Sequence, residues 1–176
     1  VRYGAYCMEM DPHSNSLVTA YNTSMARRFS RKTRAIVRAR TPLSKDNAAQ
    51  DEWSMPEGGT FMARGVGSPP TGVGFRRIII DDPIKDHAEA HSETQRQRVW
   101  DWFMSVAMTR LSPGGIVVII MTRWHVDDLV GRLLDPKRQA ELRDGGGQTE
   151  VWHEYKLPAL AEDNDPLRRA PGEALF

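Results

Sequence analysis

The 176-residue sequence lacks three features that would assign it to a broad class of protein. It has one cysteine, Cys7, so no disulfide forms within the chain, and a reducing, cytoplasmic setting is the default. No apolar run is long enough to cross a bilayer or to serve as a signal peptide. The formal charge of +1 gives no general argument for binding to nucleic acid or membrane.

The remaining composition is that of a globular domain. The chain is 40% hydrophobic and 27% charged, and its length allows one domain with a sizeable core. It begins at Val1 without an initiating methionine and ends at Phe176 shortly after a Pro-Gly turn. We therefore expect it to be a fragment of a longer protein.

The most informative segment is Arg-Arg-Ile-Ile-Ile-Asp-Asp, residues 76–82. Its β-branched run fits a buried parallel strand, which places Asp81 and Asp82 at the carboxyl end, where open α/β sheets form their ligand crevice. This is the pattern of a Walker B strand. A buried strand whose first polar residues merely begin a loop fits the same residues.

A second apolar run, residues 116–121, carries Thr122 and Arg123 to the same expected sheet edge. In a P-loop ATPase of the ASCE class, Asp81 would hold Mg²⁺ through its waters and Asp82 would activate the attacking water. The hydroxyl of Thr122 would sense the γ-phosphate, and Arg123 would pair with phosphate or with an acid. Both also fit a plain strand cap.

Periodicity and turn signals predict further elements along the chain. They are a helix ending at residue 10, a strand at 17–21, a helix capped by Thr23 or Ser24, a hairpin of 52–55 with 60–63, one helix from Asp86 to Leu111, a short helix from Asp127 or Asp128 to Leu134, a surface loop at 135–150 and a strand at 151–157.

The helix after Thr23 carries a run of basic residues that would suit contact with DNA phosphates, although such runs usually form a solvated face. They are Arg27, Arg28, Arg31, Lys32, Arg34 and Arg38.

Histidines offer weaker candidates for a metal site. His87 and His91 have the i, i+4 spacing of a zinc pair, but no Glu stands at the metalloprotease position, and surface histidines fit better. His125 with Asp127 and Asp128 is a second candidate cluster, although the two acids equally suit a helix start.

Two other residue pairs have both a structural and a functional interpretation. Arg76 and Arg77 would supply charge to a transition state, locally or across a subunit boundary, but structural ion pairs are the commoner role of arginines beside a core strand. Trp100 and Trp102 would stack on bases, although Trp100 lies on the apolar stripe of its helix and fits a core position.

Several segments together resemble the ATPase domain of the large terminase subunit of tailed phages. They are LVTAYNTSMARRFSRKTRAI, IIIDDPIKD, SETQRQRVWDWFMSVAMTRLSPGG, IVVIIMTRWHVDDLVGRLL, KLPALAED and APGEALF, which together span most of the chain.

This resemblance implies an ASCE, RecA-like three-layer α/β fold with a mostly parallel sheet, truncated at both ends. It implies a motor that uses ATP and Mg²⁺ to package double-stranded DNA, working as a homo-oligomeric ring with the portal protein and the small terminase subunit. It places the protein in the bacterial host cytoplasm and at the procapsid portal. By position, Asp81 matches the Walker B metal acid, Asp82 the catalytic carboxylate, and residues 121–123 the coupling motif.

The sequence departs from the family in one respect that bears on activity. No G-x-x-x-x-G-K-[ST] motif is present, so we expect the phosphate-binding loop ahead of Val1 and no ATP hydrolysis by this chain alone. The family's nuclease domain would follow Phe176. Residues 1–176 would be a partial motor domain, with 152–176 as its C-terminal edge leading to a linker.

Three alternatives remain open. A helicase core of the same ATPase class would share the acids Asp81 and Asp82. A metal-dependent nuclease would use these acids with Asp127 or Asp128 around paired Mg²⁺ ions. A non-catalytic remnant would bind DNA or a capsid partner through the basic helix.

Overall fold

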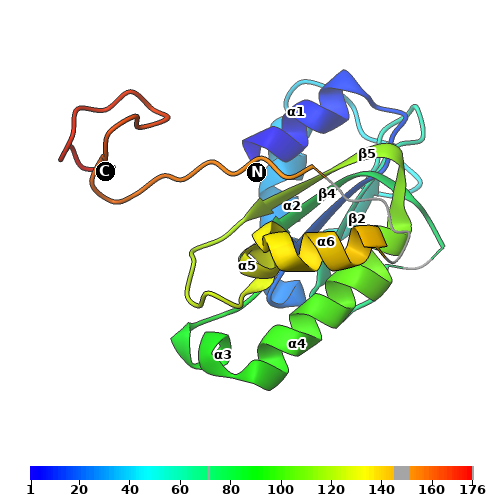
Figure 1. Ribbon diagram of the computed structural model, residues 1–176. Coiled ribbons are helices and arrows are strands. Elements are labelled where there is room, and N and C mark those ends of the chain that lie inside the picture. The colour runs from blue at the N-terminus through cyan, green and yellow to red at the C-terminus, as the bar shows by residue number, and fades with distance from the viewer. Residues whose placement is uncertain (71, 145–150, 176) are drawn as a thin grey trace. The chain divides into compact units, whose positions relative to one another are not determined.

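The computed structural model describes residues 1–70, 72–144 and 151–175, and Figure 1 shows its elements. The chain divides into two compact units, Val1–Arg132 and Leu133–Phe176. The first unit contains the sheet and the residues of interest at its edge.

Unit 1 is an α/β structure built on a five-stranded sheet in the order β2-β3-β1-β4-β5. The strands are β1 (Ser16–Ala20), β2 (Glu52–Ser54), β3 (Thr60–Gly65), β4 (Phe75–Asp81) and β5 (Leu111–Ile120). Neighbours in the series β3-β1-β4-β5 are parallel, and β2 is antiparallel to β3. The expected mostly parallel sheet and the hairpin are therefore confirmed.

Helices cover both faces of this sheet, with α4 on the face opposite α2 (Figure 1). The helices of unit 1 are α1 (Arg2–Met10), α2 (Thr23–Arg38), α3 (His87–His91), α4 (Glu93–Trp102), a π-helical turn at Phe103–Ala107, a 3₁₀ turn at Met108–Arg110, and α5 (Leu129–Leu134), whose last two residues fall in unit 2. No helix in the described ranges is long and apolar enough to cross a membrane.

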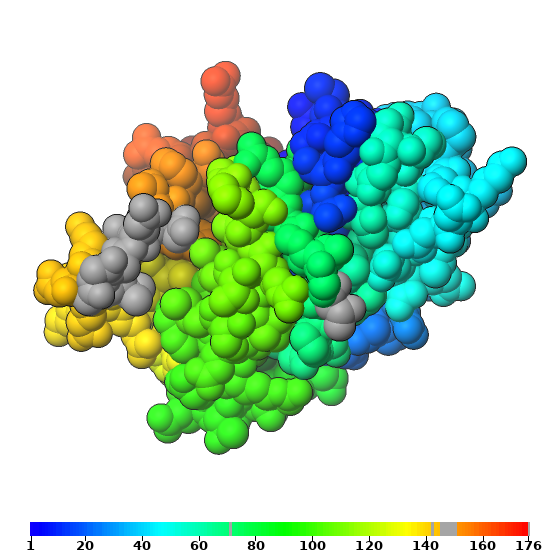
Figure 2. Space-filling model, turned by 90° about the vertical axis from the view of Figure 1, so that its right-hand side faces the viewer, coloured from blue at the N-terminus to red at the C-terminus, as the bar shows by residue number. Residues whose placement is uncertain are grey.

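The core on one face joins α1 and α2 to the strands. Val18 and Ile79 pack there with Trp53, whose ring is fully buried and stacks on Phe61 with centroids 5.0 Å apart. The indole N–H of Trp53 donates to the buried hydroxyl of Ser30 on α2, at 3.0 Å. The hairpin is thereby fixed to the helix, and residues 41–65 form one side of the unit in Figure 2, in cyan.

The cap of α2 differs from the prediction of Thr23 or Ser24. Asn22 is the N-cap, and its side chain accepts a hydrogen bond from the backbone N–H of Met25 at 2.8 Å. The hydroxyl of Thr23 is instead an acceptor for the N–H of Gly65 on β3, at 3.2 Å. The tertiary contact removes the capping group that the sequence pattern favoured.

The single helix predicted from Asp86 to Leu111 is wrong. Asp86 caps α3 as expected, but the chain breaks at Ser92, whose hydroxyl caps α4 by accepting from the N–H of Gln95 at 3.4 Å. The π and 3₁₀ turns follow, and β5 begins at Leu111, five residues before the apolar run. Leu111 pairs with Phe75 on β4, and this pairing makes β5 begin earlier than its apolar run.

Unit 2 contains α6 (Pro136–Asp144), where the sequence predicted a surface loop. Pro136 suits the first helical position, and Asp135 accepts a hydrogen bond from the N–H of Lys137 at 2.9 Å. Residues 145–150 of that loop lie outside the described residues. The strand predicted at 151–157 is wrong, because these residues adopt no regular structure.

The Ser30 contact is testable by unfolding. Ser30→Ala leaves the buried indole N–H of Trp53 without its acceptor, and we expect the free energy of unfolding to fall by about 1–3 kcal/mol. Urea denaturation measures this change. Ser24→Ala, at an exposed position of the same helix, is the control, and equal stability of the two variants would contradict a structural role for the hydrogen bond.

Candidate functional site at the carboxyl edge of the sheet

Asp82 lies just beyond the end of β4, held between the two neighbouring strands. Its N–H donates to the carbonyl of Ile120 on β5 at 2.9 Å, and its carbonyl accepts from the N–H of Tyr21 after β1 at 3.0 Å. The last ladder pair of β4 and β5 joins Asp81 to Ile120. Three strand ends therefore meet at this pair of acids, as the sequence predicted for β4 and β5.

The backbone of Asp82 is left-handed, with φ of 44°. This conformation costs a non-glycine residue about 1–3 kcal/mol, although aspartate tolerates it better than most. The turn brings the Asp82 carboxylate to the tip of β5, where Oδ1 accepts from the N–H of Thr122 at 3.4 Å. Thr122 and Asp82 are thus brought together, as expected for neighbouring strand tips.

Asp81 is a half-buried carboxyl group with a raised pKa. Desolvation is the largest cause, and the negative charge of Asp82 adds to it, while the amino group of Val1 acts in the opposite direction. No salt bridge to either acid is found within the described ranges. The pair therefore forms a site of negative charge that a cation would stabilise.

Helix α1 begins near these acids and ends at the other edge of the sheet. Val1, just before α1, lies within electrostatic range of Asp81, whereas Asp11, just after α1, forms an ion pair with Arg77 near the start of β4 at 2.9 Å. The positive end of the helix dipole thus lies on the Asp81 side. This orientation suits an anion bound at the same edge.

Arg76 and Arg77 lie at the opposite end of β4 from the acids. Four residues of strand separate Arg77 from Asp81, or about 13 Å. Arg76 donates to the carbonyl of Pro113 at 2.8 Å, and Arg77 pairs with Asp11. The structural ion pair is therefore confirmed for Arg77, whereas Arg76 is exposed and bonds only a backbone carbonyl. Neither side chain reaches the acids of its own chain.

Arg123 pairs with an acid, one of the two partners that its sequence position allowed. Its Nε donates to Oδ2 of Asp128 at 2.8 Å, and the Asp128 side chain is fully buried. The other Asp128 oxygen accepts from the N–H of Gly131 at 2.8 Å in the first turn of α5. Asp128 is therefore a helix-starting acid, as one sequence interpretation proposed.

Asp127 connects the segment after β5 to helix α4 through two buried arginines. Arg132 donates twice to its carboxylate, at 2.8 and 2.9 Å, and Arg96 donates from α4 at 3.3 Å. Arg132 also bonds Gln97 at 2.8 Å and lies over the ring of Trp100. No local sequence pattern predicts this network, because nothing near Arg96 or Arg132 in the sequence distinguishes them from surface arginines.

The histidines form a cluster of rings, and His87 and His91 are exposed, as the surface interpretation of the sequence favoured. The rings of His87 and His91 stack at 3.9 Å, and that of His125 lies edge-on to His91 at 5.5 Å. Nδ1 of His125 accepts from the N–H of Asp127 at 3.0 Å. The acids Asp127 and Asp128 already bind arginines, and the described residues contain no metal-binding group of three.

The tryptophans differ from each other in their surroundings. Trp102 is buried, with 5% of its surface exposed, and belongs to the core. Trp100 is half-buried, with its ring near that of Phe103 and under the guanidinium group of Arg132. The core interpretation of Trp100 is thus partly confirmed.

The acids at the tip of β4 fit Mg²⁺ in part. Mg²⁺ prefers oxygen ligands and usually binds one or two carboxylates together with waters and phosphates. Asp81 and Asp82 supply two carboxylates, and no basic side chain among the described residues forms a salt bridge with either of them. Phosphate and water ligands would have to complete the coordination.

Replacing Asp81 tests how much its charged carboxylate destabilises the folded state. Because its folded-state pKa is raised, the charged form opposes folding above that pKa, and the penalty disappears as pH falls below the ordinary value of 3.8. Asp81→Asn should therefore raise the free energy of unfolding at pH 7 but not at the acidic end. Urea unfolding across this range measures it, and a variant less stable than the parent at pH 7 would contradict the assignment.

Removing the charge of Asp127 should lower the stability of the fold, whereas removing that of Asp81 should raise it. Asp127→Asn leaves Arg96 and Arg132 buried without their counter-ion, and we expect a loss of about 3 kcal/mol in the free energy of unfolding. The exposed control Asp46→Asn, outside the network, should change stability by no more than about 0.5 kcal/mol. Chemical denaturation compares them, and similar values for both would show that the network contributes little.

The site thus consists of two unpaired acids at the tip of β4, the tip of β5 beside them and the start of α1 facing them. Its surroundings are fixed by the ion pairs of Arg123 and Asp127. No protein-family profile and no curated protein matches the chain.

Proposed function

We propose that this chain is part of an ATP-driven motor domain, in which the carboxyl edge of the sheet binds Mg²⁺ and the phosphates of ATP. The observation that carries the proposal is the pair Asp81 and Asp82, held without a basic partner at the tip of a central parallel strand. Asp81 would hold the metal through its waters, and Asp82 would orient and deprotonate the attacking water.

The orientation of α1 supports this proposal. A P-loop joins a strand to the amino end of a helix, so its phosphates bind where that helix begins. In this chain α1 begins near Asp81, and within the described residues β5 pairs with β4 alone, with 52% of Ile116 and of Ile120 exposed. A further parallel strand along β5 would cover this apolar edge and lead into α1, bringing the missing loop to the acids.

The contacts after β5 give the site a route to the rest of the unit. The Thr122 N–H contacts the Asp82 carboxylate, and the segment that follows is fixed to α4 through Asp127. A change at Asp82 during hydrolysis would thus move Thr122 and be passed toward α4. This fits the coupling role that the resemblance to terminases assigns to residues 121–123.

Within the proposal, the whole protein is the large terminase subunit. It would package double-stranded DNA at the procapsid portal as a ring of identical subunits, together with the portal protein and the small terminase subunit, in the bacterial cytoplasm. A separate nuclease domain would cut the DNA. A helicase core of the same ATPase class shares the acids and the sheet, and differs by motifs outside this window.

The two-metal nuclease alternative is less well supported. It needs Asp127 or Asp128 as ligands beside Asp81 and Asp82. Asp127 is held by Arg96 and Arg132, and Asp128 by Arg123, so their charge is already neutralised.

The function is tested by extending the gene upstream in the same reading frame and expressing the longer chain. We expect a G-K-[ST] loop ahead of Val1 and ATP hydrolysis that depends on Mg²⁺. Asp82→Ala should lower turnover at least about a hundredfold with nucleotide binding largely retained, because its role is to activate water.

Asp46→Ala, at an exposed acid outside the site, serves as the control and should keep full turnover. Turnover is measured as phosphate release and binding by fluorescent ATP. Normal turnover of the Asp82 variant would overturn its catalytic role, and an upstream frame without a phosphate-binding loop would overturn the proposed ATPase.

A further inference from the structure

The six basic residues of α2 separate into two groups by their contacts. Arg27 forms an ion pair with Asp51 at 3.0 Å, and Arg34 donates to the carbonyls of Ala48 and Ala49. These two side chains fix the segment before the hairpin. The other four have no hydrogen bond or ion pair to any described residue, and they are Arg28, Arg31, Lys32 and Arg38.

The four unpaired cations lie on the exposed face of the helix. Ala26, Ser30, Thr33 and Val37 form the buried face, and no acidic residue occurs anywhere in α2. Arg28 and Arg38 are ten residues apart, which is about 15 Å along the helix axis. The result is a basic surface along one side of the helix, called the basic stripe here and defined as Arg28, Arg31, Lys32 and Arg38.

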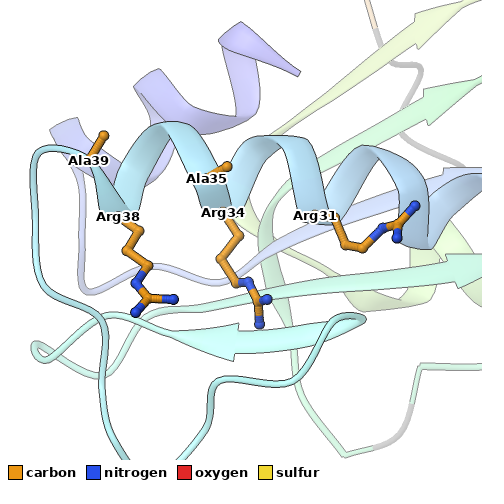
Figure 3. Close-up of a pocket in the computed structure, with 5 residues that line it drawn as sticks. All are labelled: Arg31, Arg34, Ala35, Arg38 and Ala39. Carbon is orange, nitrogen blue, oxygen red and sulfur yellow. The ribbon is translucent and has the colours of Figure 1, made fainter.

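Small residues lie between the cations of the stripe and leave a shallow hollow in the surface of α2. Ala35 and Ala39, together with Arg31, Arg34 and Arg38, line a shallow hollow of about 350 Å³ on α2. Figure 3 shows the long side chains of Arg34 and Arg38 extending from the same side of the helix. The alanines allow an anionic backbone to approach the helix between the guanidinium groups.

We propose that the basic stripe of α2 binds the phosphate backbone of duplex DNA without reading its sequence. A duplex carries one phosphate charge per 1.7 Å of axis, so about 15 Å of duplex presents about nine phosphates, four or five on each strand. Four unpaired cations over that length match the charge of one strand. Arginine and lysine are the residues that hold phosphates in such contacts.

The surface of the stripe favours a duplex over single strands or an apolar protein partner. Binding of single strands relies on aromatic side chains on which bases stack, and the exposed residues of this helix face include none. Phe29 and Ile36 are half-buried and lie off the stripe. A surface of cationic side chains with small residues between them suits the regularly spaced phosphates of a duplex.

This inference does not depend on the proposed ATPase, because binding of DNA to α2 would require no nucleotide. The test uses the full chain, a short fluorescent duplex of mixed sequence and anisotropy at a series of KCl concentrations. Four phosphate contacts predict a slope of about −3.6 in the logarithm of the binding constant against that of salt. The double variant Arg31→Gln with Arg38→Gln should reduce this slope by about two.

A matched double variant controls for net charge. Lys45→Gln with Arg98→Gln removes two exposed cations outside the stripe, and its slope should equal that of the parent. Arg31→Lys with Arg38→Lys keeps the charge and should also retain the parent slope, which separates charge from packing. Circular dichroism confirms that each variant keeps its helices.

Four results would overturn the proposal. The control double could lower the slope as much as the stripe double, which would show unspecific attraction. Inorganic phosphate at constant ionic strength could displace the duplex, which would show a single-phosphate pocket. A single-stranded oligonucleotide could bind more tightly than the duplex. The stripe variants could instead alter sedimentation and leave DNA binding unchanged, which would assign the stripe to a contact between subunits.

Discussion

Two backbone hydrogen bonds at Asp82 determine the arrangement of the whole site. They join this residue to Tyr21 after β1 and to Ile120 at the end of β5, so the ends of three parallel strands are held in register. The left-handed turn that makes both bonds possible also directs the Asp82 side chain to Thr122. If this turn relaxed, Asp81 and Asp82 would lose their common position, and the tip of β5 would no longer contact them.

Charge is distributed unequally around this point. Asp127 and Asp128, a few residues beyond the tip of β5, are neutralised by arginines that are wholly or partly buried, and they fix the segment to α4 and α5. Asp81, at the tip of β4, is half-buried beside a second acid and has a raised pKa through desolvation and the charge of Asp82. Folding neutralises the acids that stabilise the scaffold, whereas the pair at the edge stays available to a cation.

The sequence predicted the elements whose signal is local and strong. The apolar run before Asp81, the alternation of the hairpin and the cap at Asp86 depend on neighbouring residues, and all three occur in the structure. The predictions are wrong where contacts between residues far apart in the sequence determine the local structure. Thr23 bonds Gly65 and leaves the cap to Asn22, and pairing with Phe75 starts β5 at Leu111. The Asp127 network escaped prediction because its arginines are buried by tertiary packing, which no local pattern records.

The most direct test of the cation site is Mn²⁺ titration of the isotope-labelled chain, followed by NMR of the side-chain carboxyl carbons and backbone amides. Mn²⁺ takes the same oxygen ligands as Mg²⁺ and broadens the signals of nearby nuclei. The account predicts that the carboxyl signals of Asp81 and Asp82 and the amide of Thr122 broaden at the lowest metal concentration, before those of Asp127 and Asp128. Broadening that begins at the other acids, and leaves the tip of β4 unaffected, would contradict it.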